Sequence, residues 1–370
     1  MFKQYKLKNY HFQLIAYLII LTILGIMIIG SAEESVQNKQ IFGFAGGLII
    51  MVVISLIDYS FILRFAWIYY IGMAGLLLLV DLKGDSSGGS QRWFEIAGVR
   101  FQPSELAKIV MILFFAAFFA KFVEKINTLR MILISFALAA IPLFLILKQP
   151  DLSTTIVTGS IFITLLFIAG LSYKIVLGAL GICVPTVLIG LVFIIKKGAD
   201  FLEPYQIGRI MSWLDPTNPL YSDQARQQQN SIMAIGSGQL WGKGLNNSAS
   251  TSMKNGNFII EPQTDFIFAV AGEELGFVGT AAIIILLLLI VIECILIARK
   301  AKDLAGRMIC CGVAALIGFQ AFVNICVATG MFPNTGIPLP FVSYGLTSLM
   351  SLYIGMGFVL NVGLQPKKYH

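Results

Sequence analysis

Long apolar stretches recur along this 370-residue chain, and shorter polar segments separate them. A helix needs about 17 to 25 mostly apolar residues to cross a bilayer. The pattern predicts ten such spans, at about 11–30, 41–58, 62–81, 103–121, 130–147, 153–170, 174–196, 266–298, 308–331 and 345–364. We therefore expect an all-α polytopic membrane protein that forms a single domain over residues 1–370.

Composition supports this fold class, because 57% of the residues are hydrophobic and only 12% are charged. These values exclude an ordinary soluble domain. The first apolar stretch is followed by Ser31-Ala32-Glu33, as a signal peptide could be, but the chain then spans again and again. We interpret this stretch as a retained first span.

Basic residues in alternate short loops predict the orientation. The residues concerned are Lys3, Lys6, Lys8, Lys121, Lys125, Arg130, Arg299, Lys300, Lys302, Arg307, Lys367 and Lys368. Cytoplasmic loops are enriched in Lys and Arg, so we expect both termini in the cytoplasm. The loop at 82–102 then lies outside, as does a large extracytoplasmic loop at about 199–264, between spans 7 and 8.

The formal net charge of +7 includes many basic residues on the predicted outer side. Long loops translocate whatever their charge, but Lys108 and Lys148 lie at the ends of spans, where that explanation does not apply. Basic groups at the outer membrane surface indicate an anionic substrate, such as a phosphate-bearing lipid. We expect no nucleic acid partner, because the basic residues are divided among membrane loops. The 5 cysteines show no CxxC spacing, and the 2 histidines form no cluster, so no disulfide framework or zinc site is predicted.

The strongest candidate for chemistry is Asp265, which lies where the long outer segment enters the eighth span. An ionisable residue there is expensive unless it is paired or faces a polar cavity. We expect Pro262 in the first helical turn, Glu261 or Thr264 as its cap, and an ionised Asp265 favoured by the helix dipole. Such a carboxylate can accept a proton, bind a cation or act as a nucleophile. The alternative is that Asp265 only starts the helix.

Other outer segments also have two interpretations each. Glu105, three residues before Lys108, either neutralises that lysine or leaves it available to a phosphate. For Asp151 we favour a capping role at the sixth span over a role in binding. The segment 334–345 contains two prolines and breaks the helical pattern, which is typical either of a site at membrane depth or of a tight turn.

The glycine-rich stretch from Gly236 to Gly244 does not match a phosphate-binding P-loop. Its glycine spacing differs, and Lys243 is followed by glycine where that motif has Ser or Thr. We expect at most weaker anion binding, by exposed backbone N–H groups beside Lys243.

Several short motifs follow one another across nearly the whole chain. They are Arg92-Trp93-Phe94; Gln102-Pro103-Ser104-Glu105-Leu106-Ala107-Lys108; Gln149-Pro150-Asp151-Leu152; Arg209-Ile210 with Leu214-Asp215-Pro216; Ala234-Ile235-Gly236-Ser237-Gly238 with Gly242-Lys243-Gly244; Thr264-Asp265-Phe266-Ile267-Phe268-Ala269 with Glu273-Glu274-Leu275-Gly276; and Leu339-Pro340-Phe341 with Ser343-Tyr344-Gly345. In these motifs and their order the chain resembles the SEDS family, the RodA, FtsW and SpoVE peptidoglycan polymerases.

The resemblance implies a glycosyltransferase that polymerises lipid II at the outer face of the bacterial cytoplasmic membrane, for cell elongation or division. It implies Asp265 as the catalytic acidic residue, and a class B penicillin-binding protein as the transpeptidase partner. The expected substrates are lipid II and the growing glycan on undecaprenyl pyrophosphate, within membrane lipid. The candidate substrate-binding residues are Arg92, Trp93, Glu105, Lys108, Gln149, Asp151, Arg209, Ser237, Lys243, Glu261, Thr264, Ser343 and Tyr344.

The implied reaction needs a base near the acceptor hydroxyl and positive charge near the departing pyrophosphate. Asp265 is the candidate base, and the candidates for stabilising the leaving group are Arg92, Lys108, Arg209 and Lys243. No cofactor is certain. A divalent cation, Mg²⁺ or Mn²⁺, held by Asp265 and pyrophosphate oxygens is compatible with these residues.

Two other functions remain open from the sequence. One is a flippase or transporter of lipid-linked precursors, and the other is an O-antigen ligase or polymerase with a different acceptor. A transporter is expected to place ionisable groups near the midplane of two related halves. No internal repeat is visible here, and the polar residues gather at the outer side, which favours the enzyme.

Small residues in the ninth span suggest where a partner helix docks. Gly312, Ala314, Ala315 and Gly318 interrupt the apolar run from Met308 to Phe322, which we expect to face lipid. Small residues allow helices to approach closely in membranes. We therefore predict that the membrane helix of the transpeptidase docks against this span. The alternative is that this face only meets lipid or packs inside the bundle.

Overall fold

The computed structural model describes residues 10–87, 90–96, 99–175, 177–178, 204–246 and 260–365. In this part of the chain, 7 helices are long and apolar enough to cross a membrane: α1 (Phe12–Ala32), α2 (Glu34–Leu56), α5 (Pro103–Lys121), α6 (Leu129–Lys148), α11 (Ile267–Lys300), α12 (Leu304–Ala328) and α13 (Leu346–Leu364). Two shorter apolar helices, α4 (Ala66–Lys83) and α7 (Leu152–Ile168), pack among them. Each of these helices coincides with a predicted span, whereas the span predicted at 174–196 falls almost entirely outside the described residues.

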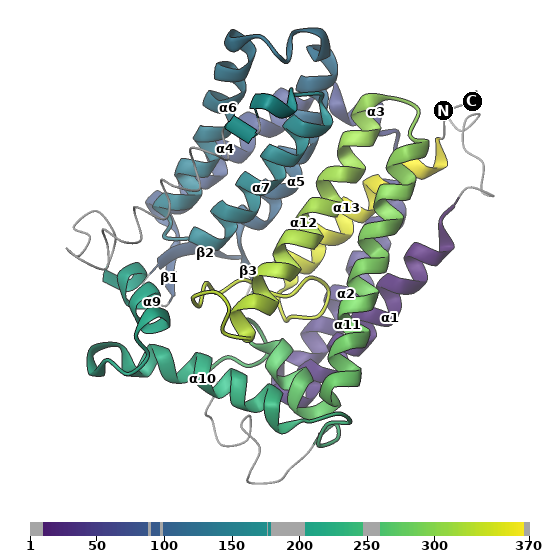
Figure 1. Cartoon of the computed structure of the whole chain (residues 1–370). Coiled ribbons are helices and arrows are strands. Elements are labelled where there is room, and N and C mark those ends of the chain that lie inside the picture. Colours follow the sequence, from purple (N-terminus) through teal and green to yellow (C-terminus); the bar gives the residue numbers. More distant parts are fainter. Residues whose placement is uncertain are drawn as a thin grey trace.

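The helices form one bundle whose two ends differ (Figure 1). The start of α1 and the end of α13 lie at the same end, where a Cβ on Gly363 would lie 2.9 Å from the His11 ring. At the opposite end, α9 (Pro204–Leu214) and α10 (Ser222–Ser237) lie across the bundle (Figure 1). The short helix α3 (Tyr59–Leu63) and two 3₁₀ turns, Val123–Lys125 and Pro219–Tyr221, lie in connections between longer helices.

Helix α12 lies at the centre of the bundle, against α5, α7, α11 and α13. Close packing is possible because Gly312 lies against α5 and α7: a Cβ there would lie 2.8 Å from Ile112 and 3.2 Å from Leu165. The prediction that Met308 to Phe322 face lipid is therefore wrong, since most of these residues are buried. The small residues mainly serve packing inside the bundle, and only a narrow stripe that includes Phe319 and Phe322 is exposed.

Helix α11 is interrupted at Gly276, whose φ of 65° and ψ of −162° are not helical. The loop that follows α10 supplies hydrogen bonds at the break: the carbonyl of Gln239 accepts from Phe277 N, and the amides of Lys243 and Gly244 donate to the carbonyls of Glu273 and Glu274. This approach requires glycine, because a Cβ on Gly242 would lie 2.1 Å from Glu274 O. The prediction that these amides hold an anion is wrong, since backbone carbonyls already accept from them.

The loop near residue 90 departs from the all-α expectation. It forms a three-stranded antiparallel sheet in the order β1 (Asp85–Ser87), β2 (Ser90–Ile96) and β3 (Val99–Phe101). Phe94 pairs with Phe101 across β2 and β3. Strand side chains alternate between faces, so Arg92 and its neighbour Trp93 point to opposite sides of the sheet. The sheet gives the loop internal hydrogen bonds and fixes the place of Arg92.

Helix α2 starts at Glu34, earlier than the predicted position 41, because a polar residue in its first turns has partners inside the protein. Gln40 is fully buried, and its Nε2 donates to Ser343 O at 3.1 Å. The amide of Gly345 donates to Gln40 Oε1 at 3.4 Å. This side chain therefore ties α2 to the loop between α12 and α13.

A second buried amide lies at the end of the bundle that holds the start of α1. Asn361 of α13 has no exposed surface, and its Nδ2 donates to Ser55 O at 2.7 Å. Its Oδ1 accepts from Tyr59 N at 3.0 Å. Asn361 thus stabilises the turn between α2 and α3, far along the bundle from α9 and α10 (Figure 1).

Candidate active site

Asp265 lies in a turn just before α11, and the helix begins only at Ile267. The amide of Thr264 donates to Glu261 O at 3.2 Å, which closes the turn. Within the described ranges no side chain caps this helix, so the prediction that Glu261 or Thr264 caps it is wrong. Pro262 precedes the helix and does not lie in its first turn. The turn starts at an exposed Glu261 with a positive φ of 51°, and it leaves the carboxylate beside the helix N-terminus.

The loop between α12 and α13, residues 329–345, donates hydrogen bonds to this turn. Ser343 Oγ donates to Thr264 O at 2.6 Å and accepts from Leu339 N at 2.7 Å. The amide of Tyr344 donates to Gln263 O at 2.8 Å. Ser343 and Tyr344, both predicted to bind substrate, therefore hold the main chain of the two residues just before Asp265.

The Asp265 carboxylate lies against Gly336 and near Arg209 of α9. A Cβ on Gly336 would lie 3.1 Å from Asp265 Oδ2 and 3.6 Å from both terminal nitrogens of Arg209. Gly336 also has a left-handed φ of 69°. Glycine is thus required here both by the backbone and by the two charged groups that meet at its face.

Burial raises the pKa of Asp265 to about 6; the Arg209 cation opposes this rise, the Glu261 carboxylate adds to it, and Arg92 and Asp151 act more weakly. At pH 7 the ionised form of Asp265 therefore exceeds the neutral form by about ten to one, because each pH unit above the pKa changes the ratio of the two forms tenfold. A base whose pKa lies near the working pH combines the ionised form with a useful proton affinity. The environment of Asp265 therefore suits proton transfer.

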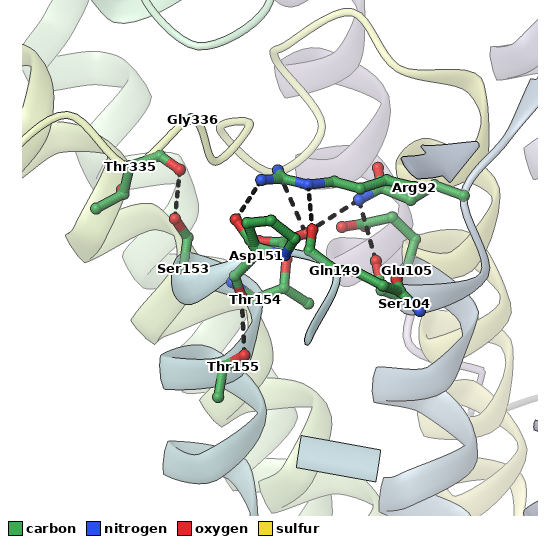
Figure 2. A network of polar contacts seen from close by, with 12 residues as sticks. Arg92, Ser104, Glu105, Gln149, Asp151, Ser153, Thr154, Thr155, Thr335 and Gly336 are labelled. Carbon is green, nitrogen blue, oxygen red and sulfur yellow. Dashed lines mark hydrogen bonds and ion pairs between the residues drawn. The ribbon is translucent and has the colours of Figure 1, made fainter. Parts of the chain in front are cut away.

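Arg92 reaches from β2 across the start of α7, below the loop that carries Gly336 (Figure 2). Its Nε donates to Gln149 O at 2.8 Å, and its Nη2 donates to Pro150 O. Its Nη1 lies 3.8 Å from Asp151 Oδ2. These contacts place a guanidinium close enough to lower the pKa of Asp265.

Asp151 has the capping role that the sequence favoured, and its second carboxylate oxygen has further partners. Its Oδ1 accepts from Thr154 N at 3.1 Å, which confirms that it caps α7. Its Oδ2 accepts from Gln102 Nε2 at 3.2 Å and faces Arg92. Gln149 donates from Nε2 to Leu77 O at 2.9 Å, so its side chain fixes this corner to α4.

Lys108 is fully buried and lies between two polar side chains. Its Nζ donates to Glu105 Oε1 and to Gln320 Oε1, both at 2.8 Å. Of the two interpretations above, this geometry favours the neutralising pair. Breaking a buried ion pair by removing one partner is strongly destabilising, so we assign Lys108 a structural role.

Lys243 and Ser237 also have partners within the protein. Lys243 Nζ lies 2.7 Å from Glu273 Oε1, beside the break in α11. Ser237 Oγ donates to Ala234 O at 2.8 Å within α10. Trp93 is partly buried in β2. Of the basic candidates, Arg209 and Arg92 act on Asp265, whereas carboxylates engage Lys108 and Lys243.

Sequence reasoning missed three residues of this site: Gly336, Gln320 and Asn324. Gln320 and Asn324 lie one helical turn apart on α12 and are both fully buried. Two amides at i and i+4 inside an apolar span are a signal that could have been noticed, because each needs a partner there. In the described part of the chain, no group of three or more His, Cys, Asp or Glu side chains could hold a metal ion.

Comparison with known proteins gives consistent relatives over the full length. The model of the FtsW, RodA and SpoVE family, described as cell cycle protein, matches residues 6–368. A protein of Geobacter metallireducens named probable peptidoglycan glycosyltransferase FtsW is 32% identical over 376 residues, covering 98% of this chain and 96% of that protein. The peptidoglycan glycosyltransferase MrdB of Escherichia coli K12 is 35% identical over 354 residues, covering 95% and 92%.

Solved structures agree with these relatives. A chain from a peptidoglycan synthase complex, described as coordinating polymerization and crosslinking, matches with a TM-score of 0.77 and 27% identity, over 96% of this chain and 97% of that chain. The rod shape determining protein RodA of Thermus thermophilus matches with a TM-score of 0.68 and 26% identity, over 96% of each chain.

Proposed function

The chain belongs to the FtsW, RodA and SpoVE family and is a peptidoglycan glycosyltransferase, and we propose that Asp265 is its catalytic base. The enzyme polymerises lipid II into glycan strands. The observation that carries this proposal is the pairing of a partly buried carboxylate of raised pKa with two arginines at one end of a membrane bundle. An apolar or fully neutralised site would offer no base and no positive charge for such a reaction.

The proposed step is a displacement at an anomeric carbon. The acceptor hydroxyl of lipid II attacks the sugar of the growing chain, and Asp265 takes the hydroxyl proton as the new C–O bond forms. The bond to undecaprenyl pyrophosphate breaks, and its electron pair leaves with the pyrophosphate oxygen. General base catalysis of this kind contributes about 10²–10⁴-fold.

Arg209 and Arg92 are the proposed cations for the leaving pyrophosphate. Both act electrostatically on Asp265, so a substrate held there bridges the base and the cations. Preorganised positive charge of this kind is a large term in catalysis because it needs no rearrangement during the reaction. Lys108 and Lys243, which the sequence suggested for the same role, have carboxylate partners and act on structure.

The remaining candidates have supporting roles in this proposal. Glu261 and Thr264 shape the turn of Asp265, and Trp93 lies at the membrane interface beside the substrate path. A divalent cation would take Asp265 and pyrophosphate oxygens as ligands, since Mg²⁺ uses one or two carboxylates together with substrate phosphates. The step above does not depend on it.

The proposed membrane arrangement has ten spans, both termini in the cytoplasm and the site outside. The described helices support it: Asp265's turn and α9 lie at the end of the bundle opposite the start of α1 and the end of α13 (Figure 1). The chain acts as one domain over residues 1–370, with the segment 199–264 as an outer loop that carries α9 and α10. A class B penicillin-binding protein is the proposed partner that crosslinks the strands.

The test is a polymerisation assay with the purified full chain and lipid II, with and without a class B penicillin-binding protein. We expect glycan strands whose length and yield increase with the partner. A flippase would instead move fluorescent lipid II across vesicles without polymer, and an O-antigen enzyme would require a different acceptor. Transport without polymer under all conditions would contradict the proposal.

A further inference from the structure

Asn324 is a buried polar residue that the proposed chemistry does not yet use. It lies in α12, has no exposed surface, and donates from Nδ2 to two carbonyls: Asp265 O at 2.8 Å and Ile337 O at 2.7 Å. The opposite orientation of the amide would set its oxygen against both carbonyls, so the hydrogen bonds define which atom is nitrogen. One side chain thus joins the turn that carries Asp265 to the loop that carries Gly336.

The energetics of burial point to these two donors. Asn324 Oδ1 has no hydrogen-bond partner among the residues that the structure describes. A buried, unpaired amide oxygen is unfavourable, so what favours an amide at this position is its pair of N–H donors. These donors link the turn that carries Asp265 to the loop that carries Ile337.

This link reaches the carboxylate through few bonds. Ile337 follows Gly336, the residue whose α-carbon faces Asp265 Oδ2 and Arg209. Fixing Asp265 O and Ile337 O on one amide therefore fixes the carboxylate against Gly336 and against the Arg209 guanidinium. A shift of 1 Å in such a geometry can lower a rate about 10²-fold.

Gln320 provides an internal comparison. It lies one turn earlier on the same face of α12, donates to Pro338 O at 3.0 Å and accepts from Lys108 Nζ at 2.8 Å. Of the two segments, Gln320 contacts only the loop, whereas Asn324 contacts both the loop and the turn of Asp265.

We propose that Asn324 is a positioning residue for the glycosyl transfer: it holds the main chain of Asp265 and of Ile337 so that the carboxylate lies correctly between Gly336 and Arg209. This inference rests on the proposed role of Asp265 as the base. Asn324 touches neither the substrate nor the carboxylate oxygens, so its effect is on the geometry of the base.

The test is Asn324→Leu in the full chain, purified and assayed with lipid II. The variant keeps the branched shape and the number of heavy atoms of the side chain and removes both donors. We expect the melting temperature to fall by about as much as in the Asn361→Leu control, kcat per folded molecule to fall by about tenfold to 10²-fold, and KM for lipid II to stay within about twofold. The acid limb of the pH profile should move to lower pH, because a loosened turn admits water and burial is the largest cause of the raised pKa of Asp265.

Three further variants separate the possible causes. Asn361→Leu removes an equally buried amide at the other end of the bundle, so it should lower stability and leave kcat per folded molecule and the pH profile unchanged. Asn324→Ser replaces the leucine variant if that variant folds poorly. Its hydroxyl is too short to reach both carbonyls, so it should lower kcat as well. Asp265→Ala assayed in parallel tests the base itself: an active alanine variant contradicts the proposed function.

Two results would overturn the positioning role while Asp265→Ala is inactive. The first is that both Asn324 variants have the kcat of the wild type and the same acid limb in the pH–rate profile. The other is a loss of kcat in Asn361→Leu equal to that in Asn324→Leu, which would trace the effect to general loosening of the bundle.

Discussion

Replacing Gly336 with alanine is expected to reduce turnover by disturbing Asp265 directly. The added Cβ would lie 3.1 Å from Asp265 Oδ2 and 3.6 Å from the Arg209 terminal nitrogens. The first distance is shorter than an ordinary contact, so the carboxylate must move by a few tenths of an ångström. Misplacement by 1 Å costs about 10²-fold in rate, and a displacement of this smaller size should cost about tenfold in kcat.

The same substitution also strains the backbone, which requires a matched control. A residue with a Cβ in the left-handed region is disfavoured by about 1–2 kcal/mol, and Gly336 has a φ of 69°. Gly170 has a φ of 97° but has nothing within 4 Å of a Cβ. Gly170→Ala therefore carries similar backbone strain without contact at the site.

The assay compares glycan polymer formed per folded molecule with thermal unfolding of each purified variant in detergent. Both variants should lose a similar amount of stability, and only Gly336→Ala should lose turnover. Equal turnover in the two variants, whether both are normal or both reduced, would refute the reasoning that the Gly336 surface positions the base.

Three further predictions follow from charge and burial. Turnover should fall as the pH drops through about 6, where Asp265 gains its proton. Arg209→Gln should move this acid limb to higher pH, because the arginine lowers the pKa of the carboxyl. A pH–rate profile with no shift in the variant would contradict the assignment. Lys108→Met should cost about 3–5 kcal/mol of stability and reduce folded yield, because Glu105 stays buried without its cation. Adding Glu105→Gln should recover the yield, measured by size-exclusion chromatography. Normal yield in the single variant would show that the pair is not structural. A cysteine replacing Leu220, which is 83% exposed, should react with a membrane-impermeant maleimide added to intact cells, and labelling only after permeabilisation would invert the proposed orientation.

The membrane helices could be predicted from the sequence because apolar length and hydrophobic composition determine them directly. The limits of α2 could not, because Gln40 looks like a loop residue until its partners at Ser343 and Gly345 are known. The sheet at β1 to β3 was also missed, since its strands are short and stabilised by pairing with one another.

The acidic centre of the site was predictable, because Asp265 is an ionisable residue beside an apolar span. Its electrostatic partners could be predicted only in part, because Arg92 and Lys108 are both basic and both lie near the predicted outer side. Only the fold distinguishes a guanidinium near Asp265 from an ammonium held by Glu105. The glycine-rich stretch near Gly242 illustrates the same limit, since the hydrogen bonds that fill the break at Gly276 come from long-range contacts.

The central claim is that Asp265 is the base for glycan polymerisation, and the most direct measurement is the rate of polymer formation by purified Asp265→Asn beside the wild type. Asparagine keeps the size of the side chain and cannot accept the proton, so folding and lipid II binding should persist while the rate falls by about 10²-fold or more. Full-length glycan strands formed by Asp265→Asn at the wild-type rate would contradict the account.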